Sequence, residues 1–184
     1  MSSSLVFPRP AVDRQAFDDA VARLAGAVAI VTWWDEAPRG LLVRAVNLLS
    51  TRPPRVLFGV DKDDFGHETL LRTDACALNL LSDADEAEAQ RFAQAGPPDR
   101  FSPDRWRLSP DQPPRIAAGA VYLSGGIDQK IDAGSHSLFV VRVETAEIKN
   151  RAPLVYFDRG FRRLAQSPPS AGAQVIDLST GSPR

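Results

Sequence analysis

The sequence predicts a mainly β protein, an antiparallel β-barrel with two or three flanking helices. Short runs of β-branched and aromatic residues outnumber the stretches in which apolar residues recur at helical spacing. Most connections between these runs are too short to hold the helix that joins parallel strands. The chain of 184 residues is 43% hydrophobic and 24% charged, which is ordinary for one globular domain.

The first half of the chain is expected to begin with a helix and to continue as strands. Asp13 is the predicted N-cap of this helix, and Gly26 is its predicted end. Between them, apolar residues recur at helical spacing at Phe17, Ala20, Val21 and Leu24. Strands are then expected at residues 27–33, 40–45, 55–60 and 75–81, with a short helix at 68–73.

The second half is expected to hold one more helix, a long loop and the two longest strands. Ser82 or Asp83 can cap a helix over residues 85–94. Six prolines predict an irregular stretch at 95–118, and loops of this length are usually functional or cross a neighbouring subunit. Further strands are expected at 120–131, 136–149 and 154–157, with a last extended segment at 161–164.

The domain is expected to span residues 16–165. An extended N-terminal arm (1–15) precedes it, and a flexible C-terminal tail (166–184) rich in Ser, Pro, Gly and Ala follows. The longest apolar run is far shorter than the roughly 20 residues of a membrane-spanning helix. We therefore expect a cytoplasmic protein that does not cross a membrane.

Composition excludes several classes of site. The 22 basic and 23 acidic residues give a net charge of -1, which excludes nucleic-acid binding by bulk charge. The single cysteine, Cys76, excludes an intramolecular disulfide and any multi-cysteine metal site, and two histidines are too few for a histidine cage. The acidic run at 83–88 is interpreted as a helix N-terminus that complements the helix dipole, and no metal site is predicted.

Six segments follow one another along residues 16–165: FDDAVARLAGAVAIVT, RGLLVRAVNLLSTRPPRVLFGV, CALNLLS, DRF, AGSHSLFVVRVETAEI and PLVYFDRGFRRL. In this order and spacing they resemble the flavin reductase-like family, whose fold is the FMN-binding split barrel. Members use NADH or NADPH to reduce FMN or FAD and release the reduced flavin to a partner monooxygenase. They are typically homodimers with flavin sites near the subunit interface.

The resemblance therefore implies a homodimeric NAD(P)H:flavin oxidoreductase that supplies a flavin-dependent monooxygenase. Hydride transfer between two ring systems needs a shaped slot more than an acid–base triad, which suits a chain with few histidines. The resemblance leaves open the choice between FMN and FAD and the choice between NADH and NADPH.

Residues 40–50, GLLVRAVNLLS, match the family segment that lines the flavin. The resemblance implies cofactor contacts at Val43, Arg44, Ala45, Leu48, Leu49 and Ser50. The segment departs from the family pattern at Leu42, Arg44 and Leu48, which replace a threonine, a small polar residue and a serine. Arg44 can pair with the flavin phosphate, fill the slot with its bulk, or form a surface ion pair.

The loop at 61–67 corresponds to a stretch rich in serine and threonine in the family. Its amides and Lys62 can meet the flavin phosphate, so Asp61, Lys62 and His67 are candidate cofactor-binding residues. Acidic residues oppose a dianion, so a solvated turn is the alternative. Asn79 matches a family asparagine beside the cofactor, and an amide within an apolar strand needs a ligand or backbone partner.

His136 lies in GSHS, which matches the family segment Gly-Asp-His-Thr. The resemblance implies that His136 lies near the nicotinamide or the flavin as the candidate catalytic residue; a histidine that caps the strand is the alternative. Tyr156 is placed near the nicotinamide or in the core. A rival hypothesis is a split barrel that has lost flavin reduction and binds another small molecule or acts as an accessory subunit, because Leu42, Arg44 and Leu48 remove hydroxyl groups and add bulk.

Overall fold

The structure, a computed structural model, describes residues 12–94 and 100–164. Most of the predicted arm and all of the predicted tail lie outside these residues. The helices are α1 (Arg14–Val21), α2 (His67–Arg72) and α3 (Glu86–Gln94). The strands are β1 (Gly26–Ala27), β2 (Ala29–Asp35), β3 (Ala37–Val43), β4 (Val46–Thr51), β5 (Pro54–Asp61), β6 (Ala75–Leu80), β7 (Trp106–Ser109), β8 (Gln112–Ile116), β9 (Val121–Ala133), β10 (His136–Ile148), β11 (Leu154–Phe157) and β12 (Gly160–Arg163).

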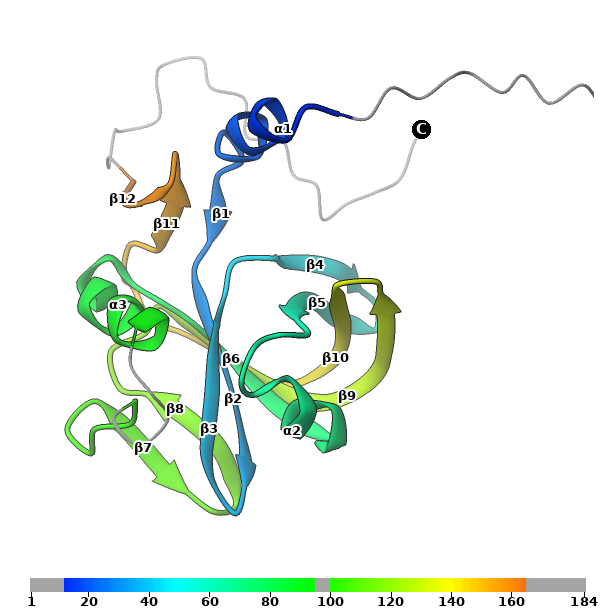
Figure 1. Cartoon of the computed structure of the whole chain (residues 1–184). Coiled ribbons are helices and arrows are strands. Elements are labelled where there is room, and N and C mark those ends of the chain that lie inside the picture. Colours follow the sequence, from blue (N-terminus) through cyan, green and yellow to red (C-terminus); the bar gives the residue numbers. More distant parts are fainter. Residues whose placement is uncertain (1–11, 95–99, 165–184) are drawn as a thin grey trace, which may run out of the picture.

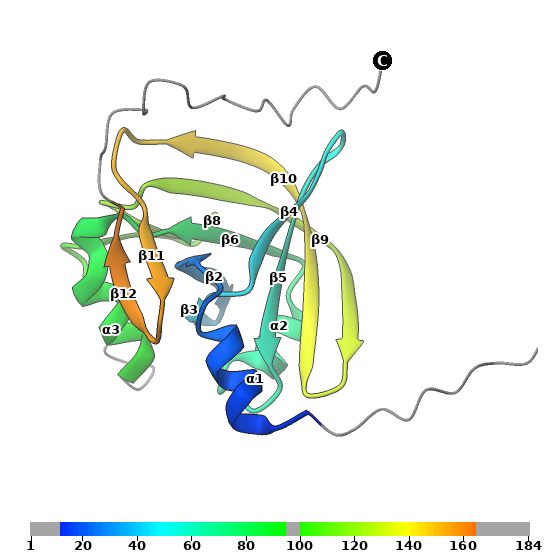
Figure 2. The same cartoon turned by 90° about the horizontal axis from the view of Figure 1, so that it is seen from above.

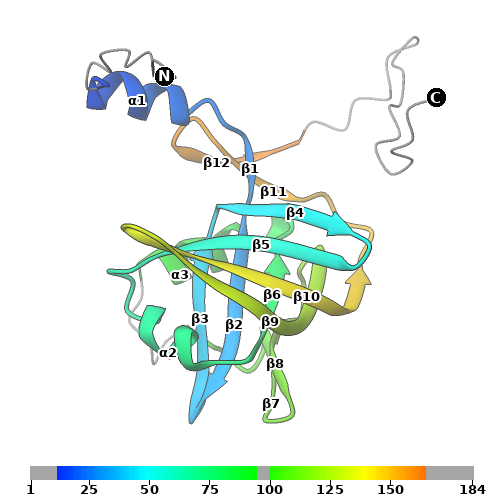
Figure 3. The ribbon, with the colours of Figure 1, turned by 90° about the vertical axis from the view of Figure 1, so that its right-hand side faces the viewer.

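The main sheet has seven antiparallel strands in the order β3-β2-β6-β9-β10-β5-β4. Leu41 of β3 and Phe58 of β5 belong to one buried cluster, although the two strands lie at or near opposite edges of the sheet. The sheet therefore curls on itself, and β4 and β5 cross over β2 and β3 in Figure 3. The predicted antiparallel barrel is confirmed. β4, an edge strand, has no counterpart among the predicted elements.

β2 is buried on both faces because it separates two apolar cores. Val31 and Trp33 point into the curled sheet, where Phe58 and Phe139 stack with ring centroids 5.1 Å apart. Val28 and Ile30 point outward to a second core built with α3, β7, β8 and β11. This double burial explains why the residues of β2 form an almost continuous apolar run in the sequence.

The predicted irregular stretch at 95–118 is wrong for its second half, which forms the β7–β8 hairpin beside β2 and β3 (Figure 1). Pro113 and Pro114 lie within β8, where they are tolerated because β8 has a single strand partner. The carbonyl oxygens of β8 find partners on β2, where the Thr32 hydroxyl donates to Pro114 O at 2.6 Å and the Trp34 indole donates to Gln112 O at 2.6 Å.

A second sheet, β1-β11-β12, joins the two ends of the described chain. Gly26 pairs with Tyr156, and the Asp158 amide donates to Ala22 O at 2.8 Å. Figure 2 shows the β11–β12 pair and α3 together on one side of the main sheet. α1 begins at its predicted N-cap, Asp13, whose carboxylate accepts from two backbone amides, but it ends at Val21 and buries no side chain.

None of the described helices is long and apolar enough to cross a lipid bilayer.

Candidate functional site

The tip of the β9–β10 hairpin meets the loop that follows β5. Asp61 and His136 are paired in register, with His136 Nε2 3.9 Å from Asp61 Oδ2, and both side chains are about half exposed. The Lys62 amide donates to Ser135 O at 2.9 Å. The Lys62 ammonium group donates to Asp132 Oδ1 at 2.8 Å and holds the pKa of that exposed carboxyl below its ordinary value. The structure thus brings three candidates, Asp61, Lys62 and His136, together.

His67 is a structural residue of this loop. It is 5% exposed, and its Nε2 forms a 2.8 Å hydrogen bond with the hydroxyl of Ser137, which is 4% exposed. The prediction that His67 binds a cofactor is therefore wrong: the ring faces β10 and fixes the start of α2. His136, by contrast, keeps a surface position with its Nδ1 2.9 Å from Ser135 Oγ.

The outer face of β5 continues from Asp61 toward the link between β3 and β4. Along β5, Val56, Phe58 and Val60 point into the core, so the alternate residues Gly59 and Asp61 share the outer face. The Gly59 amide donates to Ala45 O at 3.0 Å. A β-carbon at Gly59 would stand 3.5 Å from Ala45 Cβ and 3.3 Å from Leu138 Cδ2.

Ala45 and Gly59 therefore form a small floor beside the Leu138 side chain, and Asp61 lies further along β5, paired with His136. Gly59 was not among the predicted site residues. A single glycine within an apolar strand often marks a close approach of another backbone or a ligand, and this signal could have identified it.

The opposite border of the floor is a stacked pair of residues from distant parts of the chain. The guanidinium of Arg44 lies over the ring of Tyr156, 4.3 Å from its centroid. Tyr156 is half-buried and packs edge-on against Phe161, with ring centroids 5.8 Å apart. Among the residues that the structure describes, Arg44 stacks on Tyr156 and forms no ion pair, so two candidate site residues meet.

The remaining candidates of the 43–50 segment face in different directions. Val43 is 4% exposed and belongs to the core, so its side chain is not part of a ligand surface. A register shift between Leu48 and Ser50 turns two consecutive leucines outward, and Leu48 and Leu49 are 70% and 51% exposed. The Ser50 hydroxyl donates to Pro53 O at 2.5 Å and closes the β4–β5 turn.

Asn79 is fully buried and does not reach the floor. Its amide nitrogen donates to Ile30 O, to Thr32 Oγ1 and to Pro114 O, and its oxygen accepts from the Ile116 amide at 2.9 Å. The expectation of a ligand contact is wrong, and the alternative of a backbone partner is confirmed. Asn79 attaches β8 to the sheet, because the prolines of β8 leave its polar groups with few strand partners.

The site is a shallow face. Arg44 and Tyr156 form one border, and Asp61 and His136 form the other. A sequence model described as a flavin reductase like domain matches residues 21–165. The chain belongs to the flavin reductase-like family.

Relatives of known name agree with this assignment. The chain is 30% identical to "FMN reductase (NADH) RutF" of Ancylobacter novellus over 162 residues, which cover 86% of this chain and 90% of that protein. The solved structure of the NADH:FAD oxidoreductase SgcE6 of Streptomyces globisporus C-1027 matches with a TM-score of 0.79 and 28% identity, covering 88% of this chain and 100% of the other.

A third match is BorF, the flavin reductase component of a bacterial two-component tryptophan halogenase. Its TM-score is 0.77 at 25% identity, covering 84% of this chain and 100% of BorF. The predicted family, the split-barrel fold and the class of enzyme are thus confirmed for this flavin reductase-like protein.

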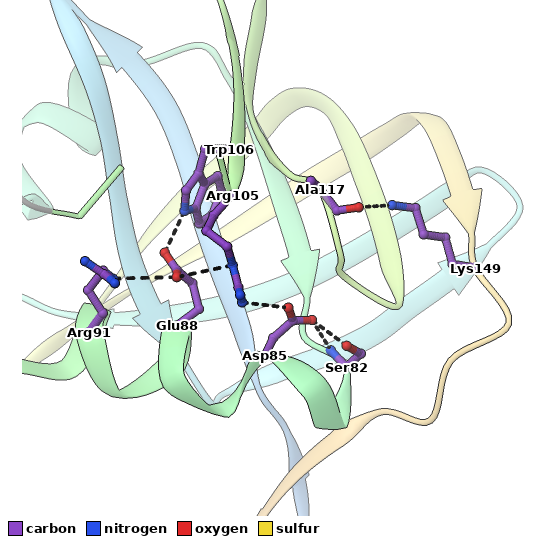
Figure 4. A network of polar contacts seen from close by, with 8 residues as sticks. All are labelled: Ser82, Asp85, Glu88, Arg91, Arg105, Trp106, Ala117 and Lys149. Carbon is purple, nitrogen blue, oxygen red and sulfur yellow. Dashed lines mark hydrogen bonds and ion pairs between the residues drawn. The ribbon is translucent and has the colours of Figure 1, made fainter. Parts of the chain in front are cut away.

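The acidic run of this flavin reductase-like protein is a buried polar network (Figure 4). Asp85 accepts from the amide and hydroxyl of Ser82, which confirms Ser82 as the cap. Glu88, 2% exposed, accepts from the Trp106 indole at 2.7 Å, and Arg105 lies 3.4 Å from Asp85. These carboxylates anchor the β7 hairpin on α3, so complementing a helix dipole is only part of their role. No cluster of metal-ligating side chains occurs among the described residues.

Cys76 lies in the first core, fully buried. Desolvation raises the pKa of its thiol to about 12, so the sulfur stays protonated at neutral pH and is a poor nucleophile. Cys76 is thus a small residue of the core.

Proposed function

We propose that this flavin reductase-like protein is an NADH-dependent flavin reductase whose flavin ring lies on the Ala45–Gly59 floor. The observation that carries this proposal is the floor itself, because Ala45 and Gly59 together carry only one methyl group, so a planar ring can lie against their backbones beside Leu138. Among the relatives, one is named an FMN reductase and another an FAD reductase. FMN and FAD carry the same ring system.

The residues present fit such a ring. Ala45 and Gly59 would lie against one face of the ring, and Arg44, whose guanidinium lies 4.3 Å from the Tyr156 ring centroid, would supply a cation for the flavin phosphate. Leu42 is partly buried against the second core, so the loss of the family's threonine at this position removes no group from the floor.

When bound, the flavin supplies the chemistry by accepting a hydride from the reduced nicotinamide. The chain supplies position. His136 has its Nδ1 fixed by Ser135 at 2.9 Å and its Nε2 turned toward Asp61, so the imidazole stands at the border of the floor. We assign His136 to contact the nicotinamide and to hold a proton at Nε2 beside the Asp61 carboxylate. Lys62, beside Asp61 and Ser135, and Tyr156, beneath Arg44, complete the surroundings of the site.

The test is NADH oxidation with FMN or FAD, followed by the loss of absorbance of the reduced nicotinamide. Gly59→Ala is expected to raise the KM for flavin about tenfold, because one added methyl group on the floor displaces the ring. Gly126→Ala is the matched control, since a β-carbon at Gly126 meets its nearest atom at 3.5 Å and lies on β9 away from the floor. Absence of turnover with either flavin, together with absence of flavin binding in titration, would overturn the proposal.

The floor is open in a single chain, and we infer that a second copy covers it in a homodimer. Leu48 and Leu49 project from β4, the edge strand next to Ala45, and an exposed apolar edge favours association. Leu48→Lys combined with Leu49→Lys is expected to weaken dimerisation at least about tenfold, measured by sedimentation velocity. Ile148→Lys, at an 81% exposed position on β10, is the control. A double variant that sediments as wild type does would contradict the inference.

We further propose that the reduced flavin passes to a partner monooxygenase component. BorF is named as the flavin reductase component of a two-component tryptophan halogenase, which supports transfer of the reduced flavin to a second protein component. A cytoplasmic location is proposed with it, supported by the single buried cysteine.

A further inference from the structure

A cleft on the far side of the 61–67 loop carries features that the floor does not use. It is shallow and open to solvent, and it lies between the β2–β3 hairpin, the start of α2 and residues 100–101. Its lining includes Arg39, Phe65, Gly66, Arg100 and Phe101. The cleft combines guanidinium groups with aromatic rings, which is the chemistry that binds a planar ring attached to an anion.

Arg39 contributes a guanidinium group to the lining of the cleft. Its Nε is buried, and among the residues that the structure describes this atom has no hydrogen-bond partner. The nearest carboxylate oxygen, Asp35 Oδ2, is 3.8 Å away, beyond hydrogen-bond distance. The Arg39 side chain as a whole is 31% exposed, so the rest of its guanidinium group is accessible to an anion bound in the cleft.

The second guanidinium and an exposed ring complete the arrangement. Arg100 donates from Nη1 to Gly40 O at 2.9 Å, and burial lowers its pKa. Phe65 is 74% exposed at the mouth of the cleft. Gly66 packs closely against Trp33 at the base of the cleft, because a β-carbon at Gly66 would stand 2.9 Å from the Trp33 ring. A flat ligand can thus stack on Phe65 while its anionic part reaches Arg39.

The cleft and the flavin floor are separated only by the loop. Asp64 belongs to this loop: its amide donates to Asp61 O at 3.1 Å, and its carbonyl oxygen accepts from the His67 amide at 2.9 Å. Burial, with a contribution from Asp61, raises the pKa of Asp64. A ligand that extends from His136 across this loop therefore reaches the cleft with its other end. The acidic groups that face it there are Asp64 and Asp35.

We propose that the cleft binds the adenosine diphosphate moiety of a dinucleotide, with the adenine on Phe65 and the diphosphate at Arg39 and Arg100. The inference rests on the proposed function, because NADH and FAD both carry this moiety while FMN does not. NADH and FAD present the same adenosine diphosphate moiety to the cleft, and kinetics with different substrates distinguish them. In either case the reacting ring lies at His136 and the adenylate lies beyond the loop.

Binding is tested directly by titrating the full-length protein with ADP into the millimolar range, with chemical-shift or calorimetric detection. Arg39→Gln is expected to weaken ADP binding at least about tenfold, through loss of a charged donor. Phe65→Ser is expected to weaken it about tenfold through loss of stacking. Asp64→Asn is expected to tighten it severalfold, because it removes an opposing charge. Arg107→Gln, an exposed arginine on β7, is the control that leaves ADP binding unchanged.

Kinetics then identify the source of the moiety. If NADH places its adenylate in the cleft, Arg39→Gln raises the KM for NADH with FMN as acceptor, and reduced nicotinamide mononucleotide is used equally well by variant and wild type. If FAD does so, Arg39→Gln weakens FAD binding and leaves FMN binding unchanged. Either pattern supports the proposal.

ADP that fails to bind the wild type, or binds the Arg39 and Phe65 variants as tightly, overturns the proposal even where flavin reduction proceeds. The two proposals fail separately. ADP binding that depends on Arg39, in a protein that reduces no flavin, keeps the adenylate site and removes the reductase function.

Discussion

Gly125→Ala is expected to prevent the chain from folding into a stable barrel. A β-carbon at Gly125 would stand 1.9 Å from the Arg142 carbonyl oxygen and 3.0 Å from the Glu144 amide nitrogen. The register between β9 and β10 shifts between Val143 and Thr145, so the extra residue, Glu144, folds the β10 backbone over Gly125. Backbone atoms of a central strand pair cannot move aside as a flexible side chain would.

The expected loss is at least about 4 kcal/mol in the free energy of unfolding, a large part of the total stability of a domain. Gly126→Ala is the matched control one residue away, where the nearest atoms are at 3.5 and 3.8 Å, and its expected effect is below about 1 kcal/mol. Urea unfolding followed by circular dichroism measures both variants. A Gly125→Ala protein that unfolds at the same urea concentration as wild type would show that β10 does not approach β9 so closely.

Asn79→Ala is expected to lower the free energy of unfolding by about 3 kcal/mol. The change leaves the Ile116 amide without its 2.9 Å acceptor, and it removes the amide donor shared by Ile30 O, Thr32 Oγ1 and Pro114 O. All of these groups lie in or beside a buried strand, so water does not replace the lost partner at low cost.

Flavin affinity separates this structural role from a ligand contact. The folded fraction of Asn79→Ala is expected to bind flavin as wild type does, because Asn79 is 0% exposed and faces β8. Asn150→Ala, at an exposed asparagine after β10, is the control, with an effect below about 0.5 kcal/mol. A variant with unchanged stability and weakened flavin binding would return Asn79 to the cofactor site.

The strands that the sequence predicts well are those whose burial is decided locally. β2, β5, β6, β9 and β10 contain apolar or alternating runs, and their patterns are sufficient because each contributes residues to the core. β4 is an edge strand with outward leucines, so its pattern is not that of a buried strand. The prolines of the β7–β8 hairpin hide its strand pattern in the sequence. The hairpin is bound by the polar side chains of Thr32 and Asn79, which lie far from it in the sequence.

The candidate site is predictable only in part, for a related reason. The meeting of Asp61 with His136 follows from strand pairing, and the family pattern already pointed to both residues. The stacking of Arg44 on Tyr156 depends on how the small sheet sits beside the barrel, which no local pattern determines. His67 and Asn79 have the residue types of a site, but their side chains turn inward to satisfy buried partners.

The pairing of β1 with β11 has a consequence for synthesis on the ribosome. Gly26 and Ala27 pair with Tyr156 and Val155, and the Val28 and Leu81 backbones hydrogen-bond in turn with Leu154. The segment that leaves the ribosome first therefore waits for nearly the last residues of the described chain before it can pair. During translation β1 therefore stays unpaired until β11 has been synthesised. Because the two strands are so far apart in the sequence, their pairing is a late event in folding.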